Sequence, residues 1–193
     1  NAQVCGDAQV YGNAQIYGKA KICGNAEIWD NVQIYDKAYI TDKVFIADNV
    51  KVDGKSFICD NAQVYGDAQV YGNASICDHA AVFDKSRVYG NAQVYGDAQV
   101  YGDANVCGNA EISGGTEIIG NAKVKSDRDY MVFKYYFDFN QWLTWTISNN
   151  MWKIGCFYGT GEELIKKAYE DSDKNGKIYE AIVNVTKQIN NEK

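Results

Sequence analysis

The sequence contains no proline, only one histidine and no long apolar run. A membrane-spanning helix needs about 20 consecutive apolar residues, so the sequence predicts none, and it shows no charged leader followed by an apolar segment. With a net charge of −6, the chain lacks the basic composition of nucleic-acid-binding proteins. We therefore expect a soluble, cytoplasmic protein that binds neither nucleic acid nor membrane and contains no metal or other cofactor.

The most regular feature is a six-residue repeat. Val or Ile stands at every sixth position from Val4 to Val124, and a small residue or Val stands two positions before most of them. Side chains two apart in a strand point the same way, so both sets would form one inward face. Gly, Asp and Asn follow at the corners, where they tolerate a left-handed backbone. Such spacing excludes a helix, because it would wind the aliphatic residues around the axis.

Three such strands make a coil of 18 residues. The motif resembles the hexapeptide repeat of left-handed parallel β-helix proteins, a family that includes acyltransferases and γ-class carbonic anhydrases. The resemblance covers residues 1–126 and implies a mainly β fold, a left-handed triangular β-solenoid of about seven coils. Because Asn1 falls inside a repeat unit, we expect the natural protein to begin further upstream.

The chemistry of those enzymes does not carry over. The acyltransferases have a loop inserted into the coils and a catalytic histidine, and γ-class carbonic anhydrases bind metal through three histidines. This array has no insertion, and its one histidine, His79, occupies a corner. The column Asp42, Asp60 and Asp78 could attract a cation, but its simpler role is to replace glycine in the turn. We predict a non-enzymatic protein without catalytic residues, and an acyltransferase-like enzyme stays the alternative.

The residue after each aliphatic position points outward, and residues 18 apart form three columns, two of them rich in aromatic residues. Stacked rings can simply stabilise the solenoid, whereas an exposed apolar stripe indicates an interface. In the third coil Thr41, Ala47 and Asp53 replace the usual residues. We hypothesise a homo-oligomer interface along the most apolar column and its neighbour Phe45. It consists of Tyr11, Trp29, Phe45, Tyr65, Phe83, Tyr101 and Ile119.

The remaining column contains four cysteines. Cys5 and Cys23 should lie one coil apart, as should Cys59 and Cys77, near the lower end of disulfide geometry. Their side chains run parallel, and the chain shows no export signal. We therefore expect free thiols, with disulfides as the alternative.

The composition changes after Val124. Residues 127–193 contain three of the four tryptophans and predict a small α+β domain. Three alternating runs, 130–137, 142–148 and 151–157, predict strands, and the last two flank an Asn-Asn turn. Thr160 and Glu163 form a capping box that opens a helix ending near Tyr169. A second helix follows residues 171–176. Its expected apolar face is Ile178, Ile182, Val185 and Ile189.

The segment "SNNMWKIGCFYGTGEELIKKAYEDS" resembles a C-terminal module of hexapeptide-repeat proteins from phages and prophages of Gram-positive gut bacteria. This resemblance implies a phage protein directed at a host protein, such as a component of an antiviral defence system. The module could cap the last coil or could recognise a partner. Since Trp and Tyr dominate interface hot spots, its candidate partner-binding residues are Trp142, Trp145, Trp152, Phe157 and Tyr158. The leading hypothesis is a non-catalytic binding protein, and a purely structural, self-assembling element is the other alternative.

Overall fold

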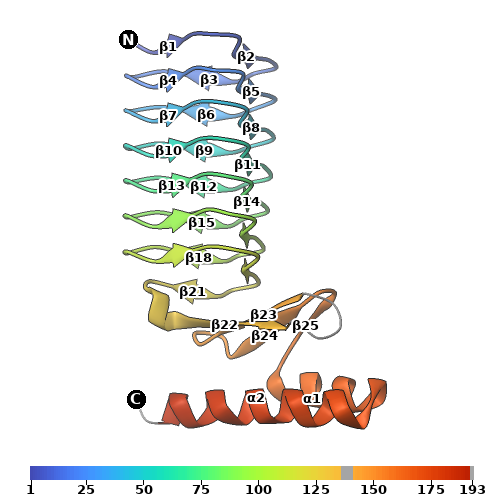
Figure 1. Ribbon diagram of the computed structural model, residues 1–193. Helices are drawn as coiled ribbons and strands as arrows, with labels where there is room; N and C mark the ends of the chain where they lie inside the picture. The colour runs from blue at the N-terminus through green and yellow to red at the C-terminus, as the bar shows by residue number, and fades with distance from the viewer. Residues whose placement is uncertain (136–140, 192–193) are drawn as a thin grey trace. The chain divides into compact units, whose positions relative to one another are not determined.

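The computed structural model describes residues 1–135 and 141–191 in two compact units, Asn1–Asp129 and Tyr130–Lys193. The first unit is a parallel β-solenoid whose chain passes in turn through three seven-stranded sheets (Figure 1). Each strand pairs with the strand 18 residues away, as Ile58 pairs with Ile76. The solenoid of about seven coils expected from the six-residue period is confirmed.

All strands of the solenoid are two residues long. The first sheet contains β1 (Gln3–Val4), β4 (Lys21–Ile22), β7 (Tyr39–Ile40), β10 (Phe57–Ile58), β13 (Ser75–Ile76), β16 (Gln93–Val94) and β19 (Glu111–Ile112). The second contains β2 (Gln9–Val10), β5 (Glu27–Ile28), β8 (Phe45–Ile46), β11 (Gln63–Val64), β14 (Ala81–Val82), β17 (Gln99–Val100) and β20 (Glu117–Ile118). The third contains β3 (Gln15–Ile16), β6 (Gln33–Ile34), β9 (Lys51–Val52), β12 (Gln69–Val70), β15 (Arg87–Val88), β18 (Asn105–Val106) and β21 (Lys123–Val124).

The inward residues form a continuous, mostly apolar core. From Ala20 to Val124 the aliphatic residues of the repeat are almost fully buried, and burial of each Val or Ile contributes about 1.5–3 kcal/mol. Where a hydroxyl replaces alanine it is satisfied locally. Ser86 Oγ donates to the carbonyl of Phe83 (2.7 Å), and Thr116 Oγ1 donates to that of Ser113 (2.7 Å). The core therefore tolerates these polar substitutions without an unpaired buried group.

A short 3₁₀ helix, η1 (Asp127–Asp129), follows the last coil. Within the solenoid, backbone N–H groups such as that of Gln93 donate to a carbonyl of the next coil. The backbone N–H of Glu111 in the last coil donates instead to Asp127 Oδ1 (2.8 Å). Asp129 Oδ2 accepts from the N–H groups of Lys125 and Ser126 (2.8 and 2.9 Å). The first unit thus satisfies part of its own terminal edge.

The second unit contains an antiparallel sheet followed by two helices. Its strands are β22 (Tyr130–Tyr135), β23 (Gln141–Thr146), β24 (Met151–Ile154) and β25 (Phe157–Gly159), and its helices are α1 (Gly161–Asp171) and α2 (Asp173–Asn191). The expected strand at 151–157 is two strands, because the backbone turns at Gly155 with a φ of 50°. The capping box between Thr160 and Glu163 is confirmed. In the described parts of both helices, no segment is long and apolar enough to cross a membrane.

The expected inner face of α2 is wrong in part. Val185 is 48% exposed, whereas Val183 and Thr186 are buried. The helix also begins at Asp173, inside the expected loop, so Gly176 is helical. A Cβ atom at Gly176 would clash with the Tyr169 ring, so the absence of a side chain permits the close approach of α2 to α1.

Candidate binding surfaces

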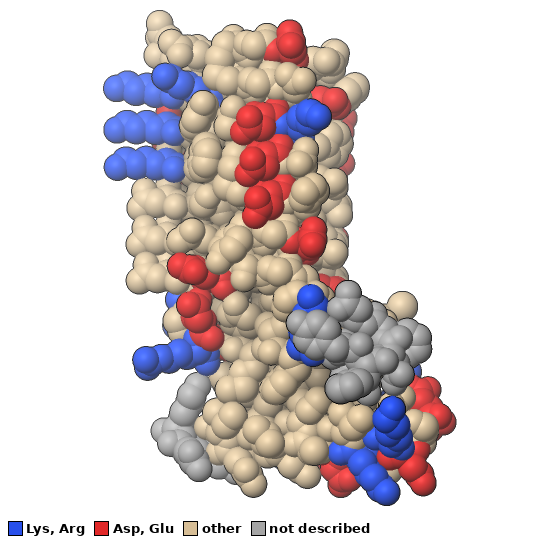
Figure 2. Space-filling model, in the orientation of Figure 1, with Lys and Arg blue, Asp and Glu red and all other residues tan. Residues whose placement is uncertain are grey.

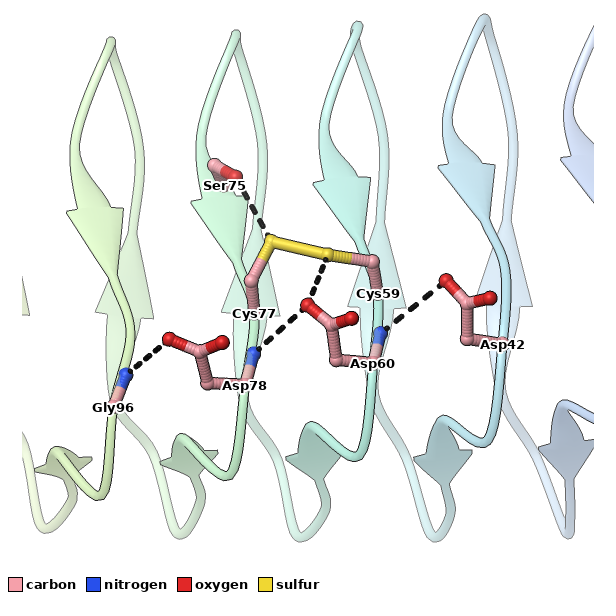
Figure 3. Close-up of a disulfide and its surroundings, with 7 residues drawn as sticks. All are labelled: Asp42, Cys59, Asp60, Ser75, Cys77, Asp78 and Gly96. Atoms are coloured by element: carbon pink, nitrogen blue, oxygen red, sulfur yellow. Dashed lines mark hydrogen bonds between the residues drawn. A yellow bond between two sulfur atoms is a disulfide. The ribbon is translucent and has the colours of Figure 1, made fainter.

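The corners of the solenoid explain the aspartate column. Asp42, Asp60 and Asp78 have φ values of 59–66°, in the left-handed region that glycine usually occupies. Each carboxylate also accepts a hydrogen bond from the backbone N–H one coil further on. The acceptor–donor pairs are Asp42 with Asp60 (3.5 Å), Asp60 with Asp78 (3.2 Å) and Asp78 with Gly96 (2.9 Å) (Figure 3). Aspartate thus replaces glycine at these corners and links adjacent coils.

The cysteine column contains two disulfides, Cys5–Cys23 and Cys59–Cys77, with Cα separations of 4.7 and 4.8 Å. The expectation of free thiols at these four positions is wrong, because the coil spacing brings each pair within bonding distance despite their parallel direction. Cys59, Asp60 and Cys77 are the one described cluster whose ligand-type atoms lie within 4.8 Å of one another. Both sulfur atoms are bonded to each other (Figure 3), so they are not available as thiolate ligands.

Comparison with known families agrees with this repeat geometry. Residues 2–18 and 86–102 match the YdcK beta solenoid repeat. The two matches start at the same position within the six-residue unit, since residues 2 and 86 both lie two positions before an inward aliphatic residue. No curated protein and no solved structure matched the chain. The chain is therefore a β-solenoid repeat protein.

On the outside of the solenoid, the aromatic columns contain stacked rings. The hypothesised oligomer column contains a tilted Tyr11–Trp29 pair, with ring centroids 4.4 Å apart. Further along, Phe83 stacks between Tyr65 and Tyr101 at 4.9 and 4.6 Å. Tyr11, Trp29 and Phe45 are exposed, and Tyr65, Phe83, Tyr101 and Ile119 are half-buried. Phe45 lies on β8 of the second sheet, and the other residues of this column directly follow strands of the same sheet.

The other aromatic column contains two stacked tyrosine pairs. Tyr17 stacks on Tyr35 at 5.0 Å and Tyr71 on Tyr89 at 4.7 Å. Burial, followed by the hydrogen bond and charge of Asp53, raises the pKa of Tyr35 to about 12. A hydrogen bond with Cys107, together with burial, raises the pKa of Tyr89 to about 12. The phenols of Tyr35 and Tyr89 therefore keep their protons at physiological pH.

The third coil interrupts both aromatic columns. Ala47 and Asp53 stand in place of rings, and Ala47 is nearly buried. On the first sheet, Tyr39 and Phe57 stack instead, with centroids 5.6 Å apart.

His79 lies at an exposed corner, and its Nε2 is 3.4 Å from Asn61 Nδ2. This corner histidine therefore lies beside an amide side chain.

The structure separates the five candidate partner-binding residues of the second unit. Trp145 and Trp152 are each 1% exposed and stack 5.8 Å apart in the core. This burial corrects their assignment as surface contacts. Trp142 is half-buried, with Lys134 Nζ 4.9 Å from its ring centroid. Phe157 is half-buried and Tyr158 exposed on β25. These last two are adjacent on the three-residue strand β25.

A groove of about 240 Å³ opens beside β25. Ile154, Phe157 and Leu164 supply apolar surface, and the remaining lining residues are Gln141, Gly155, Cys156, Lys167, Ala168, Asp171, Asn175 and Tyr179. Sequence analysis missed the helical part of this groove. The available signal was spacing, since the α1 residues Leu164, Lys167, Ala168 and Asp171 lie three or four positions apart on one helix face.

Proposed function

We propose that the chain is a non-catalytic binding protein, in which the solenoid is a rigid support and the second unit recognises a protein partner. The observation that carries this proposal is the groove lined by Phe157, the neighbour of the exposed Tyr158 on β25. It combines apolar surface with the charged groups of Lys167 and Asp171, whose ends can orient a bound chain. Partial burial raises the pKa of Tyr158, so its hydroxyl stays a hydrogen-bond donor.

The terminal contacts of the solenoid also favour recognition over simple capping. Asp127 and Asp129 already accept hydrogen bonds from the last coil, so covering the edge requires less than a whole folded unit. The partner class follows from the resemblance to phage modules. We propose a host protein, including a component of an antiviral defence system, as the partner, within the host cytoplasm.

Replacement of Phe157 and Tyr158 by Glu should abolish partner retention while the protein stays folded. Two carboxylates at this surface would have to be desolvated against an apolar partner, and loss of a hot-spot residue costs about 2 kcal/mol or more. The measurement is quantitative recovery of the partner first captured by the wild-type protein from host extract. The matched control carries Asn184→Glu and Val185→Glu, two exposed residues of α2. Equal retention by both double variants would contradict the proposal.

Self-association of the solenoid is a second candidate function. The observation in its favour is the exposure of Tyr11, Trp29 and Phe45 along one column, because apolar side chains grouped on a surface favour an interface. We propose the column from Tyr11 to Ile119 as a homo-oligomer interface.

Replacement of Trp29 and Phe83 by Glu should lower the mass measured by light scattering to that of a monomer. Burial of two new carboxylates in a symmetric interface would cost several kcal/mol. The control places the same charges at Tyr17 and Tyr89 in the neighbouring column, and a thermal melt checks that both variants are folded. A wild-type protein that is monomeric at high concentration would dispose of this interface.

A further inference from the structure

A row of lysines follows one corner of the solenoid. Lys19, Lys37 and Lys55 occupy the same place in three successive coils, between the third and first sheets. All three side chains are exposed, and Figure 2 shows three such blue side chains projecting one above another. The Cα spacing between coils, 4.7–4.8 Å at the disulfides, sets the rise from one lysine to the next.

Two further lysines flank this row. Lys21 lies on β4 and Lys51 on β9, so we define the lysine corner as residues 15–21, 33–39 and 51–57. It contains five of the 19 Lys and Arg residues but two of the 25 Asp and Glu residues, so it carries +3 while the rest of the chain carries −9. Such separation of charge attracts anions to the corner and repels them elsewhere.

The corner is shaped for a linear ligand that lies along the solenoid. A shallow groove is lined by Gly18, Lys19, Asp36, Lys37, Gly54 and Lys55 and therefore crosses all three coils. An acidic peptide cannot add here as a strand. The backbone of the corner is already paired, with Lys19 N–H bonded to the Asp36 carbonyl and Lys37 N–H to that of Gly54.

The aromatic residues beside the lysines disfavour a single-stranded nucleic acid. Nucleic-acid bases bind by stacking on free ring faces. Here Tyr17 and Tyr35 stack on each other at 5.0 Å with planes 4° apart, and Tyr39 stacks on Phe57 at 5.6 Å. This stacking occupies one face of each ring and leaves the exposed Tyr17 and Tyr39 side chains at the surface. Their phenol hydroxyls suit a ligand rich in hydroxyl groups.

We propose that the lysine corner binds an anionic glycan that carries one carboxylate or phosphate per sugar. In an extended two-fold chain of pyranose rings, every second sugar presents its anionic group to the same side. This repeat is close to the rise of two coils, so such groups meet Lys19 and Lys55, with Lys37 between them. The flanking tyrosines then contact sugar hydroxyls. This inference does not depend on the partner proposed for the second unit.

The test measures binding of a fluorescent oligogalacturonate, long enough to span three coils, to the full chain by anisotropy at low salt. We expect binding that weakens as salt increases. Changing Lys19, Lys37 and Lys55 together to Glu should weaken it by about tenfold or more, given the usual strength of three exposed ion pairs. The control, Lys43→Glu with Lys85→Glu and Lys166→Glu, alters the net charge equally at exposed lysines outside the corner and should retain most of the affinity.

Each alternative result has a defined meaning. No binding of oligogalacturonate, or equal losses in the corner and control variants, would overturn the site. A neutral oligosaccharide of the same length should not bind. Polyglutamate and a single-stranded oligonucleotide of matched charge should bind at least about tenfold more weakly than the uronate. Equal binding of either one would overturn the assignment to glycans.

Discussion

Replacement of Trp152 by alanine is expected to unfold the second unit while the solenoid stays folded. Trp152 is 1% exposed and packs against Trp145, Phe133 and Leu164. Truncation of a buried Trp costs about 3–5 kcal/mol, which equals the whole stability available to a single core of this size. Both α-helices of the described chain belong to this unit, so loss of the helical circular dichroism signal with retained β signal is the measurement.

The control for this prediction is Trp142→Ala. Trp142 is half-buried and contacts the Lys134 ammonium group, so its removal should shift the denaturation midpoint modestly and leave the helices formed. A Trp152→Ala protein with an unchanged midpoint would contradict the assignment of Trp152 to the core. The two variants therefore distinguish a core tryptophan from a surface tryptophan of the same β-sheet.

The sequence alone is sufficient to predict the solenoid because the same inward residues repeat in every coil. An inward Val or Ile at each sixth residue leaves one register that buries them all, and the parallel pairing of Val64 with Val82 follows from it. The same columns predict which aromatic residues stack, as Tyr71 does on Tyr89. The sequence also predicts the role of aspartate at the corners, since Asp60 and Asp78 replace glycine where φ is positive.

The second unit was harder to predict because it has no repeat to average over. A single glycine, Gly155, divides one expected strand into two. The buried face of α2 includes Gly176 and Thr186. A pattern of apolar residues does not include these two, so it predicts the buried face incorrectly. Strand alternation does separate Trp145, which is buried, from Trp142, which is half-buried, but composition treats both as candidate contacts.

The candidate sites followed the same division. The register of the coils predicts which cysteines are neighbours. The absence of an export signal favours free thiols, whereas the Cα separations of 4.7 and 4.8 Å allow the disulfides that the structure contains. The lysine row lies two residues beyond the outward columns, at corner positions where an exposed lysine is ordinary, so the columns do not predict it. The groove beside Phe157 needs the tertiary contact of β25 with α1, which no local pattern specifies.

Replacement of residues 130–193 by an unrelated capping element is expected to give a soluble solenoid that has lost its protein partner. The junction after Asp129 keeps η1, whose Asp127 and Asp129 carboxylates satisfy N–H groups of the last coil. Removal of the second unit without a substitute should increase aggregation, because strand edges that remain open pair with other chains.

The two roles of the second unit predict different outcomes for this graft. If the unit were a cap alone, any element that covers the edge would restore both solubility and partner retention. If it recognises the partner, the graft restores solubility only, because Phe157, Tyr158 and the groove beside them are gone. The measurements are monodispersity by light scattering and recovery of the partner captured by the intact chain. Full recovery by the graft would place the protein-binding surface on the solenoid, whereas loss shared by the graft and the Phe157→Glu, Tyr158→Glu variant would locate it at β25.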